Sequence, residues 1–286
     1  MALIVGVHGI GQQLKGRNTL KAAWLPAMRD GLELARGPVL SDDQVACAFY
    51  GDLFRGKGLG EPPYTAKDVS AGFERELLEQ WWREAAATDP AVPGPEDKTK
   101  LRTPDPVQRA LHALSRSRFF AGLGERALIH FIKQVHRYFA EPELRDQVRE
   151  RVAREVDADT RILVAHSLGT VVAYEVLCGH PDWPVRVLVT LGSPLGIPNV
   201  IFDRLCPAPA AGLGAWPGRI QRWVNVADHG DAVALVKQLR PLFGDGDGRG
   251  GSVEDLQVDN GATAHDVNPY LTAVETGHAI AAGLSR

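Results

Sequence analysis

Ser167 stands at a place in the sequence where its hydroxyl could act as a nucleophile. The apolar run at residues 162–165 predicts a buried parallel strand, and the apolar-periodic segment after Gly169 predicts a helix that ends near Gly179. A serine in so tight a strand–turn–helix takes a strained backbone conformation, with its hydroxyl presented above the sheet. Its neighbours two positions away must then be small, and they are Ala165 and Gly169. The alternative is a serine that only caps the following helix.

A glycine-rich turn, His8-Gly-Ile-Gly-Gln12, follows the first predicted strand. Acyl transfer needs two backbone N–H donors for the oxyanion, and removing one such donor costs roughly 3 kcal/mol. In a serine elbow one donor belongs to the residue after the nucleophile, here Leu168, and the other comes from the loop after a neighbouring strand. Gly9 and Gly11 let that loop turn sharply without a Cβ beside the substrate. We therefore expect the amides of Ile10 and Leu168 to form an oxyanion hole.

The same turn does not fit the two common nucleotide-binding patterns. A phosphate-binding loop has the form Gly-x4-Gly-Lys-Ser/Thr; Gly6 and Gly11 have that spacing, but Gln12 and Gln13 follow. A dinucleotide fingerprint needs a third glycine where Leu14 stands. No cofactor is therefore expected.

Two further patterns could suggest a metal, and neither is complete. The glycine-rich segment 244–251 resembles a calcium loop, but Arg249 occupies a position that needs Asp or Asn, and Leu256 stands where the bidentate Glu should be. His130 and His136 are six residues apart on one predicted helix, so they do not share a face as metal ligands would. The sequence predicts no metal site.

The acid of a catalytic triad is expected after Ser167, because in serine hydrolases with a nucleophile elbow the order along the chain is Ser, Asp or Glu, His. Residues 223–226 predict a strand near the end of the sheet, and the loop after it holds Asp228 and Asp231. Either carboxylate could orient a histidine, so both remain open at this point.

His265 is our candidate for the base. It follows residues 253–258, which predict the last strand, so the acid and the histidine would follow the last two strands in the required order. Three other histidines come after the serine in less suitable places: a helix end, the acid loop and a C-terminal helical pattern, respectively His180, His229 and His278.

Three motifs together resemble the α/β-hydrolase superfamily: His8-Gly-Ile-Gly11, Ala165-His-Ser-Leu-Gly169 and Leu191-Gly-Ser-Pro194. The likeness is to its lipase-like intracellular branches, including GPI inositol-deacylase-like and DDHD-type phospholipase-like proteins. It extends in patches over residues 1 to about 50 and about 141 to 270. Ala165 replaces the first glycine of Gly-x-Ser-x-Gly, a departure that is common in lipase-like members.

The resemblance also bears on the choice of acid. The segment from Asn225 to Asp231 is similar to a DDHD-type acid segment, in which an Asn on the strand precedes Asp-Pro-Val, with Ala232 where that pattern has Pro. It therefore favours Asp231 over Asp228. The fold that it implies is an α/β-hydrolase fold, with a mainly parallel, doubly wound sheet and a helical insertion.

The composition predicts one globular domain over residues 1–286, because a chain of this length with 44% hydrophobic residues can bury one large core. Three widely spaced cysteines indicate neither a disulfide framework nor a zinc site. The net charge of −3 gives no footprint for nucleic acid. No apolar run approaches the ~18 residues of a spanning helix, and no leader pattern precedes the first strand. We therefore expect a cytoplasmic protein without an integral membrane segment, and the sequence identifies no protein partner.

Residues 51–140 are more than a minimal hydrolase needs. Apolar stripes predict helices around residues 69–81 and 128–139, and five prolines between 89 and 106 predict a loop. These helices either form a cap that shapes an acyl pocket or only cover the sheet and each other. The Pro/Gly-rich connection 198–218 is a second candidate lid.

Two functions from different classes follow. The first is a serine ester hydrolase that forms an acyl-enzyme on Ser167, with His265 as base, Asp231 as its orienting acid and no cofactor. Its substrate, by family likeness, would be a lipid ester, another acyl ester or a thioester. The second is a non-catalytic or partner-controlled module of the same fold. A complete set of candidate catalytic residues favours the first.

Overall fold

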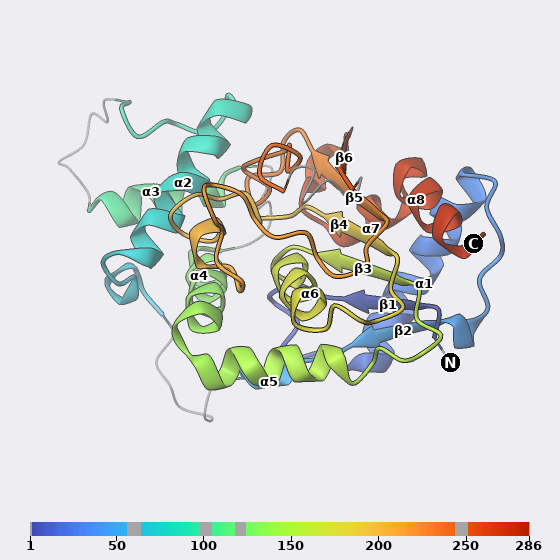
Figure 1. The fold of residues 1–286 in the computed structure, drawn as a ribbon. Coiled ribbons are helices and arrows are strands. Elements are labelled where there is room, and N and C mark those ends of the chain that lie inside the picture. The colour runs from blue at the N-terminus through green and yellow to red at the C-terminus, as the bar shows by residue number, and fades with distance from the viewer. Residues whose placement is uncertain (1, 56–63, 98–104, 118–123, 244–250, 286) are drawn as a thin grey trace.

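A sheet of six parallel strands forms the centre of the molecule (Figure 1). The computed structural model describes residues 2–55, 64–97, 105–117, 124–243 and 251–285. The strand order is β2-β1-β3-β4-β5-β6. The strands are β1 (Ile4–Val7), β2 (Val45–Ala48), β3 (Ile162–His166), β4 (Val187–Leu191), β5 (Arg222–Asp228) and β6 (Val253–Val258). This is the predicted doubly wound α/β arrangement.

The order of the strands defines a switch point between β1 and β3. From β1 the chain moves outward to β2, and it then returns to the other side of β1 to form β3 and the remaining strands. All pairings are parallel, so the carboxyl ends of the strands share one edge. In such sheets ligands bind outside the carboxyl edge at the switch point. The loop after β1 and the turn at Ser167 after β3 both lie there.

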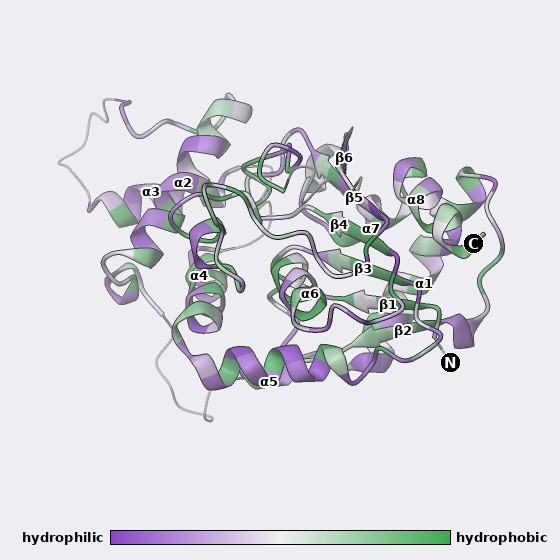
Figure 2. Cartoon of the chain, viewed as in Figure 1, coloured by the Kyte–Doolittle hydropathy of each residue, from purple (hydrophilic) through white to green (hydrophobic). Residues whose placement is uncertain are grey.

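Helices cover both faces of the sheet, and the two faces have separate cores. Alternate strand residues point to opposite faces, so Ile4 and Val164 join one core while Val5 and Leu163 join the other. The first core is closed by α1 (Arg17–Leu34), α7 (Val267–Thr272) and α8 (Val274–Leu284), and the second by α5 (Pro142–Ala153) and α6 (Leu168–Gly179). Figure 2 shows hydrophobic residues along the strands and α6, and mixed residues along the more exposed α5.

The prolines of α1 and α5 occupy different kinds of position in their helices. Pro142 is the first residue of α5, where its missing N–H is no loss. Pro26 lies inside α1, on the exposed side of the helix. There water can bind the backbone carbonyl that the proline ring leaves without a donor, so α1 continues through it.

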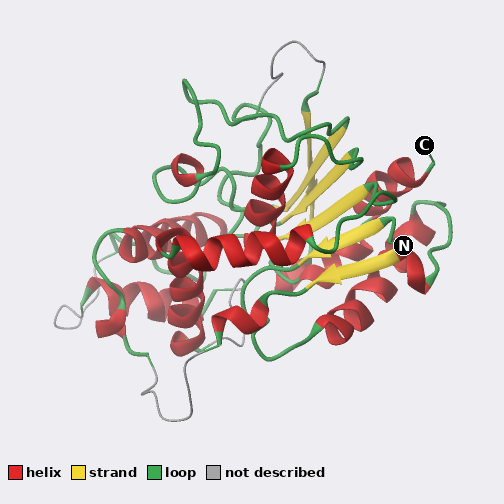
Figure 3. Ribbon diagram, turned by 60° about the horizontal axis from the view of Figure 1, so that its bottom comes forward, coloured by secondary structure: helices red, strands yellow, loops and turns green. Residues whose placement is uncertain are grey.

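Three further helices form the insertion between β2 and α5: α2 (Phe73–Thr88), α3 (Pro106–Ser115) and α4 (Glu125–Ala140). They lie beyond the edge to which the strand arrows point (Figure 3). Their buried side chains, such as Leu77, Leu111 and Ile132, belong to the same hydrophobic cluster as the α5–α6 face of the sheet. Residues 56–63, 98–104 and 118–123 of the insertion lie outside the described residues, as does most of the calcium-like segment, 244–250.

Some boundaries differ from those expected. β5 extends to Asp228, so this acid ends the strand instead of lying in the loop, and α2 begins at Phe73, after a short 3₁₀ turn. Among the described residues, short 3₁₀ helices are formed by Asp42–Gln44, Gly51–Phe54, Ala66–Asp68, Phe202–Arg204 and Gly261–Thr263. In the part of the chain that the structure describes, none of the helices has the length and apolarity required to cross a membrane.

Candidate active site

The backbone at Ser167 is strained and firmly held. Its φ of 55° and ψ of −133° are unusual for a residue with a side chain. The Ser167 N–H donates to the carbonyl of Leu191 over 3.0 Å, and its carbonyl accepts from the Thr170 hydroxyl over 2.8 Å. This is the tight turn that the strand–turn–helix pattern predicts. The side chain is only 3% exposed.

Two glycines beside this turn, Gly169 and Gly9, have no room for a Cβ. A Cβ at Gly169 would lie 2.4 Å from the carbonyl oxygens of Val7 and His8, so α6 packs directly on the end of β1. A Cβ at Gly9 would lie 2.6 Å from the Cβ of Ser167. The loop after β1 therefore passes immediately beside the serine.

His265 lies between Ser167 and Asp231 and contacts both. Its Nε2 is 3.0 Å from Ser167 Oγ, and its Nδ1 is 2.7 Å from Asp231 Oδ2. The imidazole is slightly exposed, whereas Asp231 is completely buried. The structure thus brings together the three side chains that the sequence selected, although Ser167 and His265 are 98 residues apart.

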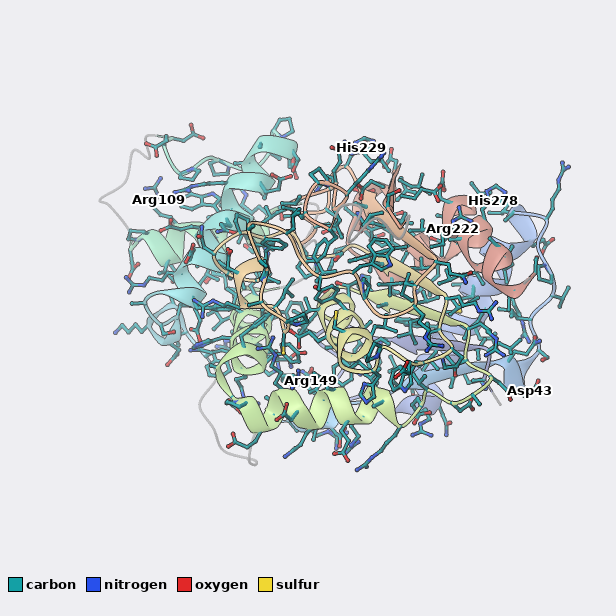
Figure 4. The ribbon with its side chains drawn as sticks, in the orientation of Figure 1. Asp43, Arg109, Arg149, Arg222, His229 and His278 are labelled. Carbon is teal, nitrogen blue, oxygen red and sulfur yellow. The ribbon has the colours of Figure 1, made fainter. Side chains whose placement is uncertain are left out.

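The other histidines after the serine do not reach this group. His180 is near the end of α6, where its Nδ1 contacts the carbonyl of Val176. His229 and His278 are exposed, and Figure 4 labels them at the periphery of the molecule, on the loop after β5 and on α8. The distances therefore select His265.

Asp231 is surrounded by donors. Tyr270 donates its hydroxyl to Oδ2 over 2.8 Å, and the N–H groups of Val233 and Ala234 donate to Oδ1 over 2.8 and 3.2 Å. Burial by itself would raise the pKa of Asp231, but the neighbouring His265, the Lys237 ammonium and the Tyr270 hydroxyl hold it below its ordinary value. Asp231 is therefore a carboxylate at neutral pH.

Tyr270 is a member of the group that the sequence analysis did not find. Its hydroxyl accepts from the Asp228 N–H over 2.7 Å while it donates to Asp231. Burial raises its pKa well above the ordinary value, so the hydroxyl keeps its proton. No short motif marks this tyrosine. Its only sequence indication is its position five residues after His265, on the next helix.

Asp228 contacts neither His265 nor the serine in the structure. Its carboxylate accepts from the N–H of Gly230 over 2.6 Å and from the N–H of Asn260. Burial raises its pKa above the ordinary value. The acid therefore ties the loop after β5 to the loop after β6, which carries His265.

Gly192 closes the group from the end of β4. Its φ is +54°, and a Cβ there would lie 2.7 Å from Asp231 Oδ2 and 3.2 Å from His265 Nδ1. The next residue, Ser193, is buried and pairs with the Thr170 hydroxyl over 2.8 Å. The third sequence motif thus supplies space for the acid–histidine pair.

Two more histidines, His166 and His8, bind backbone carbonyls beside the candidate site. His166 Nε2–H donates to the carbonyl of His265 over 3.0 Å, and burial lowers the pKa of His166 to about 3. His8 accepts the Tyr50 N–H at Nε2 over 3.2 Å, so its Nδ1–H donates to the carbonyl of Gly9 over 2.6 Å. Burial lowers the pKa of His8 to about 4. Both rings are neutral at physiological pH and hold backbone groups.

The amides of Ile10 and Leu168 are the candidate oxyanion donors. Leu168 is the first residue of α6, so its N–H has no acceptor within the helix. Within residues 2–55 and the other described ranges, neither N–H donates to a protein acceptor. Ile10 borders the cavity beside Ser167. Free amides at a helix N-terminus and in an adjoining loop suit a developing negative charge.

A cavity of about 370 Å³ opens beside Ser167 and His265. Trp81 of α2, Phe131 of α4 and Val233 give it apolar walls. Polar side chains line other parts of it, among them Gln12, Lys15, Asp266 and Asn268. The insertion therefore contributes directly to the walls around the serine.

A scan of protein-family models finds no match to the chain, and a search of curated proteins finds none either. Among the residues that the structure describes, no group of three or more His, Cys, Asp or Glu side chains could hold a metal ion.

Proposed function

We propose that the chain is a serine hydrolase of the α/β-hydrolase type that cleaves a carboxylic ester through an acyl-enzyme on Ser167. The observation that carries the proposal is the hydrogen-bonded series Ser167–His265–Asp231, with distances of 3.0 and 2.7 Å. A nucleophile, a base and a buried carboxylate in this order are the parts of a catalytic triad. The series borders a cavity, so a substrate can reach it.

In the first half of the reaction, Ser167 Oγ attacks the ester carbonyl while His265 Nε2 accepts its proton. The Ile10 and Leu168 amides donate to the resulting oxyanion. His265 then gives the proton to the leaving alcohol, and an acyl-enzyme remains. Asp231 stabilises the imidazolium and keeps Nδ1 protonated.

In the second half, a water molecule attacks the acyl-enzyme and gives its proton to His265. The tetrahedral intermediate collapses, the acid leaves and Ser167 regains its proton. The group therefore returns to its starting state without any cofactor.

The cavity supports an ester with an apolar acyl part. Trp81, Phe131 and Val233 provide apolar surface next to Ser167, and burial of acyl methylene groups there contributes roughly 0.8 kcal/mol each. On this proposal the insertion is a cap that shapes an acyl pocket, and the substrate is a lipid ester, another acyl ester or a thioester.

The test is labelling of the native protein with a fluorophosphonate probe, followed by hydrolysis assays on p-nitrophenyl esters of graded acyl length. We expect stoichiometric labelling at Ser167 and a rate that peaks at one range of acyl length. Absence of labelling, together with absence of hydrolysis in folded protein, would instead support a non-catalytic module.

A further inference from the structure

The insertion contacts the loop after β1 through a buried glutamine. Gln134, on α4, is only 2% exposed, and its Oε1 accepts the N–H of Gly11 over 2.8 Å. Its Nε2 donates to Gln13 Oε1 over 3.0 Å and contacts His130 Nε2 at 2.8 Å. The contact joins residues 123 positions apart.

These partners fix the orientation of the Gln134 amide. An N–H group can be bound only by the amide oxygen, so Oε1 must face Gly11. The two hydrogens of Nε2 then face Gln13 Oε1 and His130 Nε2, which accepts when the ring carries its proton on Nδ1. A buried amide without partners is costly, so Gln134 is held in this single arrangement.

The bond to Gly11 acts on the peptide next to the candidate oxyanion donor. The N–H of Gly11 belongs to the peptide unit directly after Ile10, and the carbonyl of that unit accepts from Gln12 Nε2 over 3.3 Å. The preceding unit carries the Ile10 N–H, and its carbonyl is held by His8. Two consecutive peptides are therefore fixed, one of them by α4.

The same helix limits the loop sterically. Gly11 has a φ of +77°, and a Cβ there would lie 2.9 Å from the Phe131 ring. Phe131 also borders the cavity. Helix α4 thus packs on the loop with Phe131 and binds it with Gln134, one helical turn apart.

We propose that Gln134 is a positioning residue that holds the Ile10 N–H in the direction needed for the oxyanion. This rests on the proposed ester hydrolase function. The insertion is then part of the catalytic arrangement as well as a wall of the cavity.

The test compares two glutamine substitutions in the full chain. Gln134→Met keeps the length of the side chain but removes its acceptor and donors. We expect kcat to fall about 10- to 100-fold, because a displaced donor loses much of its effect on the transition state. KM should stay within about twofold of the native value, since the acyl walls are unchanged. Affinity for a trifluoromethyl ketone, which forms an oxyanion on Ser167, should fall in proportion to kcat.

Two variants serve as controls. Gln134→Glu keeps an acceptor for the Gly11 N–H, and it should recover most of kcat and of the ketone affinity. Gln108→Met removes a glutamine of α3 whose Nε2 binds Glu125 over 2.7 Å, away from the loop. It should leave kcat and KM as in the native protein.

The outcomes separate the two proposals. If native protein hydrolyses esters and labels at Ser167 but Gln134→Met keeps native kcat and ketone affinity, the positioning role is wrong and the function stands. If the loss of kcat in Gln134→Met disappears at lower temperature, and the variant also has a lower Tm, then the role of Gln134 is merely structural. If Gln134→Met does not fold, a folded Gln134→Glu variant with kcat as low as that of Ser167→Ala contradicts the role. If native protein neither hydrolyses nor labels, the proposed function itself fails.

Discussion

Two completely buried carboxylates, Asp231 after β5 and Glu175 on α6, have similar partners in different parts of the molecule. Each accepts a tyrosine hydroxyl, from Tyr270 over 2.8 Å and from Tyr138 over 2.7 Å. Burial raises the pKa of both tyrosines well above the ordinary value, so both remain donors. Burial and a tyrosine donor therefore do not distinguish the acid proposed as catalytic, Asp231, from Glu175.

The nitrogen partner makes the difference. Both carboxylate oxygens of Glu175 accept from Arg145, and the distance from Arg145 Nε to Oε2 is 3.0 Å. Glu175 also accepts the Cys206 N–H at a distance of 3.2 Å. These contacts join α5, α6 and the loop after β4. Asp231 pairs instead with His265, whose second nitrogen is 3.0 Å from the Ser167 hydroxyl and borders the cavity. A guanidinium stays charged, whereas an imidazole can accept and return a proton.

The largest expected effect is that of Ser167→Ala. We expect it to abolish ester hydrolysis and fluorophosphonate labelling while the far-UV circular dichroism spectrum stays native, because a methyl group fits where the hydroxyl was. Labelling that persists, or that moves to Ser193, would contradict the assignment and leave Asp231 and Glu175 functionally alike.

Substitution of the base comes next. His265→Ala should lower kcat by roughly 10⁴- to 10⁶-fold, because the proton of Ser167 then has no acceptor. His229→Ala and His278→Ala are matched controls with native rates; loss of activity in either, with His265→Ala unaffected, would overturn the choice. Rates are measured on p-nitrophenyl esters.

Substitution of the acid tests the comparison directly. Asp231→Asn should lower kcat by up to ~10⁴-fold, because an amide no longer stabilises the imidazolium or selects its tautomer. Asp228→Asn should change kcat little. It should lower the free energy of unfolding by about 1 kcal/mol, because an amide in place of the carboxylate weakens one of the two hydrogen bonds to the N–H groups of Gly230 and Asn260. Steady-state kinetics and denaturant unfolding measure both effects. The reverse pattern would assign the acid role to Asp228, and equal mild effects would remove the acid from the mechanism.

The smallest effect on chemistry is expected from Glu175→Gln. The variant leaves Arg145 without its carboxylate, so the free energy of unfolding should fall by roughly 3 kcal/mol. At temperatures where the variant is folded, kcat should remain within about threefold of the native value. A fall in kcat as large as that of Asp231→Asn would show that the two carboxylates are not separate in function.

Local features of the site could be predicted because they depend on a few consecutive residues. The strained turn at Ser167 requires small neighbours, and the sequence shows them at Ala165 and Gly169. The β6 boundaries, Val253–Val258, agree with the predicted residues because turn-forming residues stand on both sides, at 251–252 and 259–260. β5 is longer than predicted, because pairing with β6 reaches Asp228 and extends the strand beyond its apolar residues.

The contributions of the insertion could not be predicted in the same way. The apolar stripes of α2 and α4 indicate helices with one buried face, but they do not show which part of the molecule that face packs against. Only the fold puts Trp81 and Phe131 beside the serine and Gln134 against the loop after β1. A single polar residue in a helix has no spacing rule that would identify its partner.

Local sequence patterns are enough to predict the parallel α/β sheet, the turn at Ser167, the glycine loop after β1 and the order serine, acid, histidine. These follow from backbone preferences and from the period of apolar residues, which act over short distances along the chain. The resemblance favoured Asp231 over Asp228, but only the tertiary structure shows the contacts of Asp231 with His265 and with Tyr270, and the contact of Gln134 on α4 with the loop after β1. Those contacts join residues 34, 39 and 123 positions apart, and they depend on how the loops and helices pack at one edge of the sheet.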